Sequence, residues 1–197
     1  MIFFRNDKYN DTRFSEEQKT GIDPDIKELI RRAIDGDTVA FGELYVTYVE
    51  KIYSFVFSHY RNKTFAEDVT EEIFVKAWKA IKTCRGREDT FVSWLYRIAR
   101  NHLIDEIRKL KRRPSIDTDI IEVFDSVNNE IEGYLEQQEL MAYIDKLPMN
   151  QRQVILLKFI QGLNNEEISQ VMGKSQGAIR ILQMRALDSL RKEMTGE

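Results

Sequence analysis

The stretch from Phe91 to Arg113, FVSWLYRIARNHLIDEIRKLKRR, constrains the fold more than any other part of the chain. Its apolar side chains recur at the spacing of an α-helix and need neighbouring helices to pack against. These apolar positions are Trp94, Leu95, Ile98, Leu103, Ile107 and Leu110. The pattern therefore predicts an amphipathic helix with one face in a helical core.

The other side of this helix is rich in positive charge. Residues 97 to 113 hold seven Lys or Arg and two acidic residues. The predicted polar positions are Arg97, Arg100, Asn101, His102, Arg108, Lys109, Lys111, Arg112 and Arg113, opposed by Asp105 and Glu106. A positive stripe of this kind suits the phosphates of a nucleic acid. A single basic helix more often lies on a solvated surface than in a DNA-binding site. This helix alone therefore does not establish DNA binding, which depends on evidence from the rest of the chain.

Composition favours a helical globular protein. The 197 residues include only 9 Gly and 3 Pro, and 42% of them are hydrophobic, which suffices for one large domain or two small ones. The net charge of −3 hides a strong segregation, because residues 114 to 145 hold nine acidic residues and no basic one. With Pro114 and Gly133 as helix breakers, we predict a flexible acidic linker at residues 113–133.

Several functional classes have no support in the sequence. Cys84 is the only cysteine, and His59 and His102 are too scattered for a metal-ligand spacing, so we expect no metal and no cofactor. We also find no nucleophile elbow and no glycine-rich phosphate loop, and we expect no catalytic activity. The short apolar start and the lack of a long apolar run predict a cytoplasmic protein without membrane insertion.

The N-terminal part of the chain predicts a short helical bundle. Residues 1–25 lack sustained periodicity and are expected to form a mobile extension. Asp23-Pro24 opens a helix that ends near residue 34, and a longer helix with a wide apolar face ends near Tyr60. The next helix, at residues 65–84, has an acidic face. Its acidic residues are Glu67, Asp68, Glu71 and Glu72.

This acidic face has two explanations. Acidic residues near a helix N-terminus favour the helix dipole, which accounts for part of the cluster. A dense acidic face beside an exposed Phe74 or Val75 is also suited to docking on a basic partner surface.

The C-terminal part has the pattern of a helix-turn-helix. Asn164 or Asn165 caps a short helix, Gly173 provides the turn, and Ser175 caps a longer helix. The buried positions of the longer helix are expected at Ile179, Leu182, Ala186, Leu187 and Leu190. The opposite face then carries Arg180, Ile181 and Met184, with Arg185 at its side, and we predict that this face approaches the DNA major groove.

Three segments together resemble a known family. They are AEDVTEEIFVKAW, FVSWLYRIARNHLIDEIRK and LPMNQRQVILLKFIQGLNNEEISQVMGKSQGAIRILQMRAL. In this order and spacing they resemble the bacterial alternative sigma factors of the extracytoplasmic-function (ECF) group. The resemblance implies an all-α fold of two small helical domains, sigma region 2 at residues 26–112 and sigma region 4 at residues 134–195. The chain departs from the family at Glu71, where glutamine is usual.

The family assigns roles to positions in both regions. Region 2 would bind the clamp coiled coil of the largest RNA polymerase subunit through Asp68, Glu71, Glu72 and Phe74. Its minus-ten contacts would be Arg85, Arg87, Glu88, Asp89, Arg97, Arg100, Asn101 and Arg108. Region 4 would read the duplex minus-thirty-five element with Lys174, Ser175, Gln176, Ala178, Arg180, Ile181, Met184 and Arg185, and would dock on the flap of the second-largest subunit. An anti-sigma factor is a further expected partner.

Physical chemistry agrees with this division. Single-strand capture needs cations along the backbone and pockets for unstacked bases, whereas duplex reading needs a helix in the major groove. The competing hypothesis is a freestanding helix-turn-helix regulator with an N-terminal helical sensor or dimerisation domain. Such a sensor would not need a long basic helix facing solvent.

We also expect the two regions to fold as separate units, because the linker lacks apolar residues that would hold them together.

Overall fold

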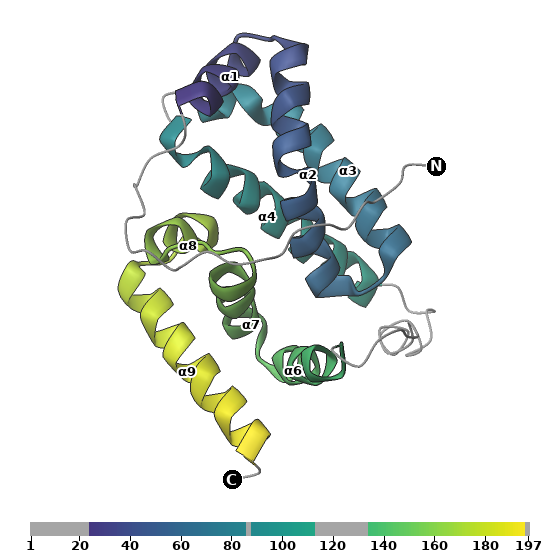
Figure 1. The fold of residues 1–197 in the computed structure, drawn as a ribbon, viewed down its shortest axis with the longest axis vertical. Coiled ribbons are helices and arrows are strands. Elements are labelled where there is room, and N and C mark those ends of the chain that lie inside the picture. The colour runs from purple at the N-terminus through teal and green to yellow at the C-terminus, as the bar shows by residue number, and fades with distance from the viewer. Residues whose placement is uncertain (1–23, 86–87, 113–133, 196–197) are drawn as a thin grey trace.

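The computed structural model describes residues 24–85, 88–112 and 134–195. Within these ranges the chain is helical and has no strand, as predicted (Figure 1). The α-helices are α1 (Pro24–Ile34), α2 (Thr38–Tyr60), α3 (Lys63–Ala80), α4 (Phe91–Arg112), α6 (Tyr134–Lys146), α7 (Met149–Ile155), α8 (Asn165–Met172) and α9 (Gln176–Thr195). The predicted N-terminal extension, except for residues 24 and 25, and the whole predicted acidic linker at residues 113–133 lie outside the described residues.

Three short helical segments complete the described chain. The 3-10 segments η1 (Ile81–Cys84) and η2 (Glu88–Thr90) lie between α3 and α4, and the π-helical segment η4 (Leu156–Ile160) continues α7. The helix predicted to run to residue 84 therefore ends at Ala80 as an α-helix and tightens into η1. No helix in the described part of the chain combines the length and apolar character needed to cross a bilayer.

Local capping explains where the helices begin and end. The Asp37 carboxylate accepts hydrogen bonds from the backbone N–H groups of Val39 (2.9 Å) and Ala40 (3.1 Å), which starts α2. At α8, Asn164 and Glu167 form a reciprocal capping box. Gly173 then adopts the left-handed conformation with φ of 63°, which ends α8 and turns the chain toward α9.

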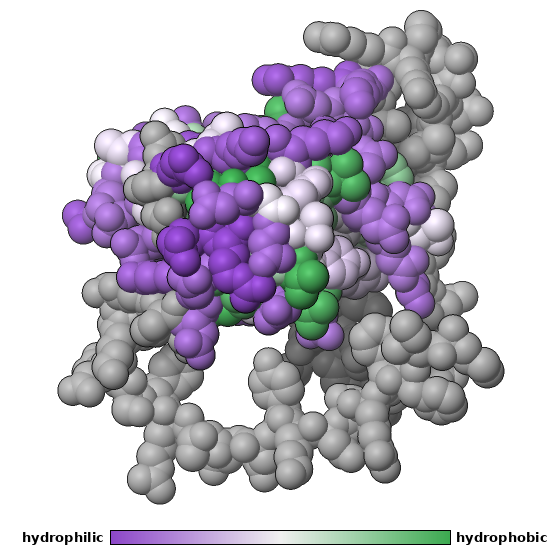
Figure 2. All heavy atoms as spheres, turned by 90° about the horizontal axis from the view of Figure 1, so that it is seen from above, coloured by the Kyte–Doolittle hydropathy of each residue, from purple (hydrophilic) through white to green (hydrophobic). Residues whose placement is uncertain are grey.

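Helices α1 to α4 enclose an aromatic core. Edge-to-face or tilted ring pairs join α2 to α4, with ring centroids 5.4 Å apart for Phe55 and Tyr96 and 5.5 Å apart for Tyr48 and Phe91. Trp94 is buried in this core, and Trp78 is partly buried against it. Viewed from the α1 end, the surface is mainly hydrophilic with small separate hydrophobic spots, so the apolar side chains are largely enclosed on this side (Figure 2).

The C-terminal helices form a second small helical domain that packs against the first. A small core of their own, which includes Ile144, Ile155 and Leu190, joins α6, α7 and α9. A second set of their apolar residues belongs to the same core as α1 to α4. This set consists of Val154, Leu157, Leu163, Ile168, Val171, Met172 and Ile179. The predicted all-α fold of two small helical domains is therefore confirmed, and the two domains also pack on each other, because α8 lies directly against α4 (Figure 1).

Candidate nucleic-acid interface

The acidic face of α3 is exposed as predicted. The side chains of Glu67, Asp68, Glu71 and Glu72 all reach solvent. They occur on the outer side of a helix whose inner side is buried through Val69, Ile73 and Ala77. The face therefore offers negative charge to a partner without taking part in the core.

Phe74 does not lie on this exposed face. Its side chain is only 5% exposed, because its ring packs edge-on against Tyr45 with the ring centroids 4.8 Å apart. Val75, one residue later, is 52% exposed. Phe74 instead helps line an open, mainly apolar groove of about 410 Å³ between α2 and α3. The other groove residues are Thr38, Phe41, Tyr45, Glu71, Val75 and Trp78.

Two ion pairs join the loop before α4 to α1 and to the turn that follows α1. Arg85 donates to Asp35 at 2.8 Å, and the Lys27 ammonium pairs with the Asp89 carboxylate. All four side chains are substantially exposed. Arg87 lies outside the described residues, and Glu88 is the first residue of η2. The loop thus has a fixed anchor on α1 that the sequence pattern did not reveal.

The arginines of α4 fall into two environments. Arg108 and Asn101 are exposed, with Arg108 paired to Asp105 at 3.5 Å. Arg97 and Arg100 are partly buried, and Arg100 Nε donates to Gln153 Oε1 of α7 at 2.8 Å. Burial lowers the pKa of Arg100 from its ordinary value. The basic stripe is therefore interrupted where the C-terminal helices lie against α4.

His102 also departs from the predicted stripe, since it is buried between α3 and α4. Its Nε2 lies 3.0 Å from the Glu72 carboxylate, and Glu106 is the third member of a cluster within 4.8 Å. These groups are possible metal ligands, but the Lys76 ammonium already contacts His102 Nδ1. The pKa of His102 is lowered, first by burial and then by the charge of Lys76. A resident cation would compete with this ammonium.

The second predicted interface is the N-terminal half of α9. Ser175 Oγ accepts a hydrogen bond from Ala178 N at 3.2 Å, so the predicted cap is present. Ser175, Gln176, Arg180 and Arg185 are exposed, whereas Lys174 and Ala178 are partly buried. Ile181 and Met184 are 49% and 64% exposed, so this face combines apolar side chains with the two arginines. Neither arginine has an ion-pair partner among the described residues, so the face remains available to a ligand.

The inner side of α9 is narrower than the sequence pattern predicted. Ile179, Ala186 and Leu190 are buried, and Leu182 is partly buried. Leu187, predicted to be buried, is 44% exposed, because only one row of side chains faces the neighbouring helices. Most of the circumference of α9 is thus open to solvent.

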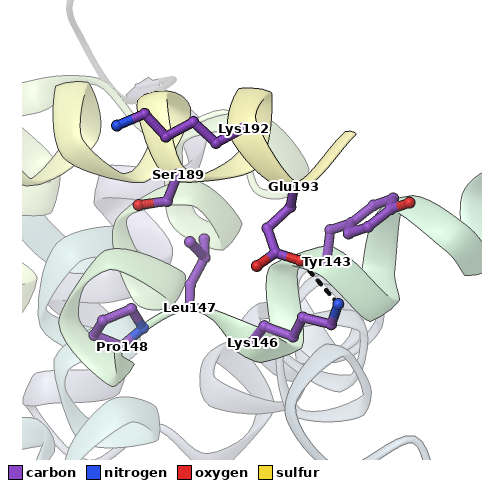
Figure 3. A pocket seen from close by; sticks show the side chains of 7 residues that line it. All are labelled: Tyr143, Lys146, Leu147, Pro148, Ser189, Lys192 and Glu193. Carbon is purple, nitrogen blue, oxygen red and sulfur yellow. Dashed lines mark hydrogen bonds and ion pairs between the residues drawn. The ribbon is translucent and has the colours of Figure 1, made fainter. Parts of the chain in front are cut away.

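A shallow pocket of about 510 Å³, lined by both polar and apolar side chains, lies between α6 and α9 (Figure 3). Leu147 and Pro148 line it from the α6–α7 turn. The Lys146 ammonium bridges it to the Glu193 carboxylate at 2.8 Å. Lys192, also at the pocket, pairs with Asp188 at 3.3 Å. Because the pocket residues of α9 lie in its C-terminal half, this surface is distinct from the face that carries Arg180 and Met184.

Three residues at the junction of the two halves were missed by sequence reasoning. Tyr96 is buried in α4, and its hydroxyl donates to Gln161 Oε1 at 2.8 Å. Arg152 of α7 donates to the backbone oxygen of Ser58 at 2.8 Å. These contacts join residues 65 and 94 positions apart in the chain, so no local sequence signal could have identified them.

Comparison with known proteins finds one matching family model in each half of the chain. The family model for sigma-70 region 2 matches residues 44–113, and the model for sigma-70 region 4 matches residues 143–192. The ECF RNA polymerase sigma factor BldN of Streptomyces coelicolor is 34% identical over 169 residues, which cover 84% of this chain and 64% of BldN. The alignment thus spans less than two thirds of the length of BldN.

A second relative is covered almost completely. The ECF RNA polymerase sigma-E factor of Escherichia coli K12 is 35% identical over 180 residues, or 82% of this chain and 90% of sigma-E. Among solved structures, CnrH in complex with the cytosolic domain of CnrY superimposes with a TM-score of 0.66. This match has 24% sequence identity and covers 88% of this chain and 99% of CnrH, and it supports the fold.

Proposed function

Because the chain belongs to the ECF group of sigma-70 RNA polymerase sigma factors, we propose that separate helices bind core RNA polymerase and the two promoter elements during promoter-specific initiation. Helix α3 docks on core RNA polymerase, α4 and its preceding loop capture the melted minus-ten strand, and α9 reads the minus-thirty-five duplex. The observation that carries the proposal is the exposed reading face of α9 on a capped helix-turn-helix.

The chemistry of the α9 face fits duplex reading. A guanidinium such as that of Arg180 can bind a guanine edge with two hydrogen bonds, and Ile181 or Met184 can pack on a thymine methyl group. Both apolar side chains are exposed, so they contribute little to the stability of the isolated fold. The buried row at Ile179 and Ala186 fixes which side of the helix faces DNA.

The chemistry of α4 and its loop fits single-strand capture. Exposed Asn101 and Arg108 provide a donor and a cation, and Arg85 and Asp89 at the loop are held by α1. Such a basic surface can track a backbone while a loop accepts splayed bases. Arg100, which donates to Gln153 of α7, joins this surface only after α7 has moved away from α4.

Two protein partners follow from the same assignment. The acidic residues Asp68, Glu71 and Glu72 suit the basic side of the polymerase clamp coiled coil, and the groove beside them adds apolar contact. The pocket between α6 and α9 offers a surface for the polymerase flap, away from the DNA-reading face. The sigma factor RpoE of Bartonella quintana, whose structure is similar in fold, is solved with the anti-sigma factor NepR, and we propose that this chain likewise has an anti-sigma partner.

Transcription with purified core RNA polymerase tests the proposal. The chain should bind core enzyme and start transcripts at defined promoters, and sequencing the five-prime ends of those transcripts would identify the promoters. A freestanding helix-turn-helix regulator would instead bind duplex DNA without core enzyme and would start no transcript. That result would overturn the assignment.

Charge reversal tests the docking face separately. Asp68→Lys with Glu71→Lys should weaken core binding and leave the helical content unchanged, because both side chains are exposed. Glu72 is left in place since it contacts His102. The matched control, Glu43→Lys with Glu50→Lys, makes the same change of charge at exposed positions of α2. Equal core affinity for the two double variants would remove α3 from the docking surface.

A further inference from the structure

Three side chains with metal-ligating groups meet where α3 packs on α4. His102 and Glu106 are four residues apart on α4 and share a face of that helix, and Glu72 approaches them from α3. One ligand atom from each residue lies within 4.8 Å of the other two. The sequence did not predict this cluster, because its members come from two helices.

The imidazole of His102 distinguishes this cluster from ordinary surface charge. The residue is 2% exposed, and its Nε2 lies 3.0 Å from a Glu72 carboxylate oxygen. These two atoms are not in hydrogen-bond geometry, and Nε2 has no hydrogen-bond partner among the described residues. A buried nitrogen without a partner is unfavourable. The separation does match two ligands of one cation, because donor atoms about 2.0–2.2 Å from zinc lie about 3.3 Å apart in a tetrahedral shell.

Glu106 provides the third ligand. Its side chain is only 19% exposed, and the Lys109 ammonium binds one of its carboxylate oxygens at 2.6 Å. A carboxylate has two oxygens that accept, so Glu106 can keep this ion pair and still turn an oxygen toward His102. Three protein ligands leave one tetrahedral position for water, which is the arrangement of an open zinc site rather than of a purely structural one.

Lys76 competes with a cation for this position. It is exposed, follows Glu72 by four residues on α3, and its ammonium contacts His102 Nδ1. An ammonium can only donate, so this contact places the imidazole proton on Nε2. A cation on Nε2 requires the opposite tautomer, with the proton on Nδ1. Cation binding therefore moves Lys76 away into solvent, which its flexible side chain permits.

The ligand set selects the class of metal. One imidazole with two carboxylates suits zinc and similar divalent transition metals, whereas Mg²⁺ and Ca²⁺ prefer oxygen ligands alone. Cys84, the only cysteine, is buried and is not a member of the cluster. Without a thiolate, and with Lys76 as a competitor, the site should exchange its metal readily.

We propose that Glu72, His102 and Glu106 form a zinc site that competes with the docking of α3 on core RNA polymerase. Glu72 is 63% exposed and belongs to both the cluster and the proposed docking face. A Zn²⁺ ion holds this carboxylate against α4 and neutralises its charge, so the carboxylate is lost to a basic partner. The competition rests on the proposed function, whereas the zinc site itself does not.

Nuclear magnetic resonance of the histidine rings tests the site in the full, untagged chain. The chain has two histidines, so His59 is an internal control. Near neutral pH, Zn²⁺ should shift the ring nitrogen signals of His102, with the ring proton moving from Nε2 to Nδ1, and leave those of His59 unchanged. Mg²⁺ should shift neither ring. Unchanged His102 signals at saturating Zn²⁺ would overturn the site.

Conservative variants separate a built site from general attraction of cations. Glu72→Gln and Glu106→Gln each remove one ligand with little change of shape and should weaken zinc binding at least about tenfold, because even changes outside the ligand set cost about 10–100-fold. Glu67→Gln on α3 and Asp105→Asn on α4 remove the same charge at exposed positions and should bind zinc like the unchanged chain. Competition with a colorimetric chelator measures the dissociation constants. Equal weakening in ligand and control variants would overturn the proposal.

Removing the competitor should have the opposite effect. Lys76→Gln should bind zinc at least about threefold more tightly, because it removes an ammonium that repels the incoming cation. Lys79→Gln makes the same change at an exposed position of the same helix and should leave the affinity unchanged. Equal affinities for the two variants would contradict a cation bound beside His102.

Core binding tests the competition. Saturating zinc should lower the affinity of the unchanged chain for core polymerase by about two- to fivefold, which corresponds to the loss of one exposed ion pair. Zinc should have no effect on Glu106→Gln, which lacks the site but retains the docking residues. Zinc that shifts the His102 signals without changing core affinity would overturn the competition. A chain that binds no core with or without zinc would count against the proposed function, while the His102 signals would still decide whether the site exists.

Discussion

The two helices proposed to read the promoter, α4 and α9, are held in the protein in different ways. Helix α4 is buried over most of its first half, where its buried residues are Phe91, Ser93, Trp94, Leu95, Tyr96, Ala99, His102 and Leu103. Helix α9 buries only Ile179, Ala186 and Leu190. Helix α4 is thus a central element of the core, whereas α9 packs on its neighbours through a single narrow row of side chains.

This difference determines how function and stability are coupled. In α4, the residues proposed to contact DNA alternate with core residues and share neighbours with them. In α9, the DNA-facing and buried residues lie on opposite sides of a helix that is mostly exposed. We therefore expect substitutions in α9 to change recognition alone, whereas substitutions in α4 change recognition, closure and folding together.

The largest expected effect is on stability. Leu95→Ala removes a side chain that is 1% exposed and should cost about 2–5 kcal/mol of unfolding free energy. Met184→Ala on the exposed side of α9 should change it by about 0.5 kcal/mol or less. Urea unfolding followed by circular dichroism measures both values. Similar losses for the two variants would contradict the contrast between a central and a peripheral helix.

The next effect is a loss of stability in acid that arises in region 2. Burial, the largest cause, lowers the pKa of His59 to about 4 from 6.5. The unfolded chain therefore takes up a proton first, and stability is lost as pH falls from about 6.5 to about 4, by about 3 kcal/mol at most. The pKa of His102 is also lowered, so it adds a loss of the same sign. Region 4 contains no histidine.

A single variant isolates this contribution. His59 Nδ1 donates to the backbone oxygen of Phe55 at 2.8 Å, and the side-chain amide of His59→Asn can donate to the same acceptor but does not titrate. Urea unfolding at pH 7 and pH 4.5 should show a smaller loss for His59→Asn than for the unchanged chain. An equal loss in both proteins would remove His59 as a source of the pH dependence.

Promoter selection should distinguish the role of α9 from that of α4. Loss of one base contact should reduce the discrimination between promoters by about 1–3 kcal/mol. With a promoter library, Arg180→Ala should lower discrimination at one or two positions of the minus-thirty-five element. Arg100→Ala should instead lower open-complex formation and its salt dependence at every promoter. A uniform decrease for Arg180→Ala would mean that Arg180 contacts only phosphates, and normal melting for Arg100→Ala would remove it from strand capture.

The smallest effect concerns the anchor of the loop before α4. Asp35→Asn removes the charge partner of Arg85, and exposed pairs of this kind contribute only about 0.2–1 kcal/mol. We expect almost no change in the urea midpoint, but a measurable change in minus-ten preference, because the loop loses a contact that fixes its position. Glu43→Gln, which also removes one negative charge at an exposed position, is the matched control. Identical promoter profiles for both variants would exclude a positioning role for Asp35.

Local sequence signals predicted most of the helical framework. Pro24, Asp37, Asn164, Gly173 and Ser175 mark helix boundaries because capping depends on a few adjacent residues. Helical periodicity also identified the buried face of α3 and the exposed reading face of α9. Helix α9 buries a single row of side chains, which is the case that periodicity describes well.

The same reasoning failed where a helix has neighbours on several sides. Phe74, His102 and Arg100 were assigned to exposed surfaces, but Tyr45 covers Phe74, α3 covers His102 and Gln153 binds Arg100. Each covering group comes from another helix. A pattern within one helix cannot show how many partners surround it.

The sequence by itself therefore determined the family, the order of the helices and the exposed face of α9, because caps, periodicity and contiguous motifs act over a few neighbouring residues. Only the tertiary structure decided that the two regions close on each other. The contacts responsible join residues 53 to 107 positions apart, such as Arg100 with Gln153 and Ser54 with Gln161. Contacts of this range depend on how whole helices pack, which no local pattern encodes.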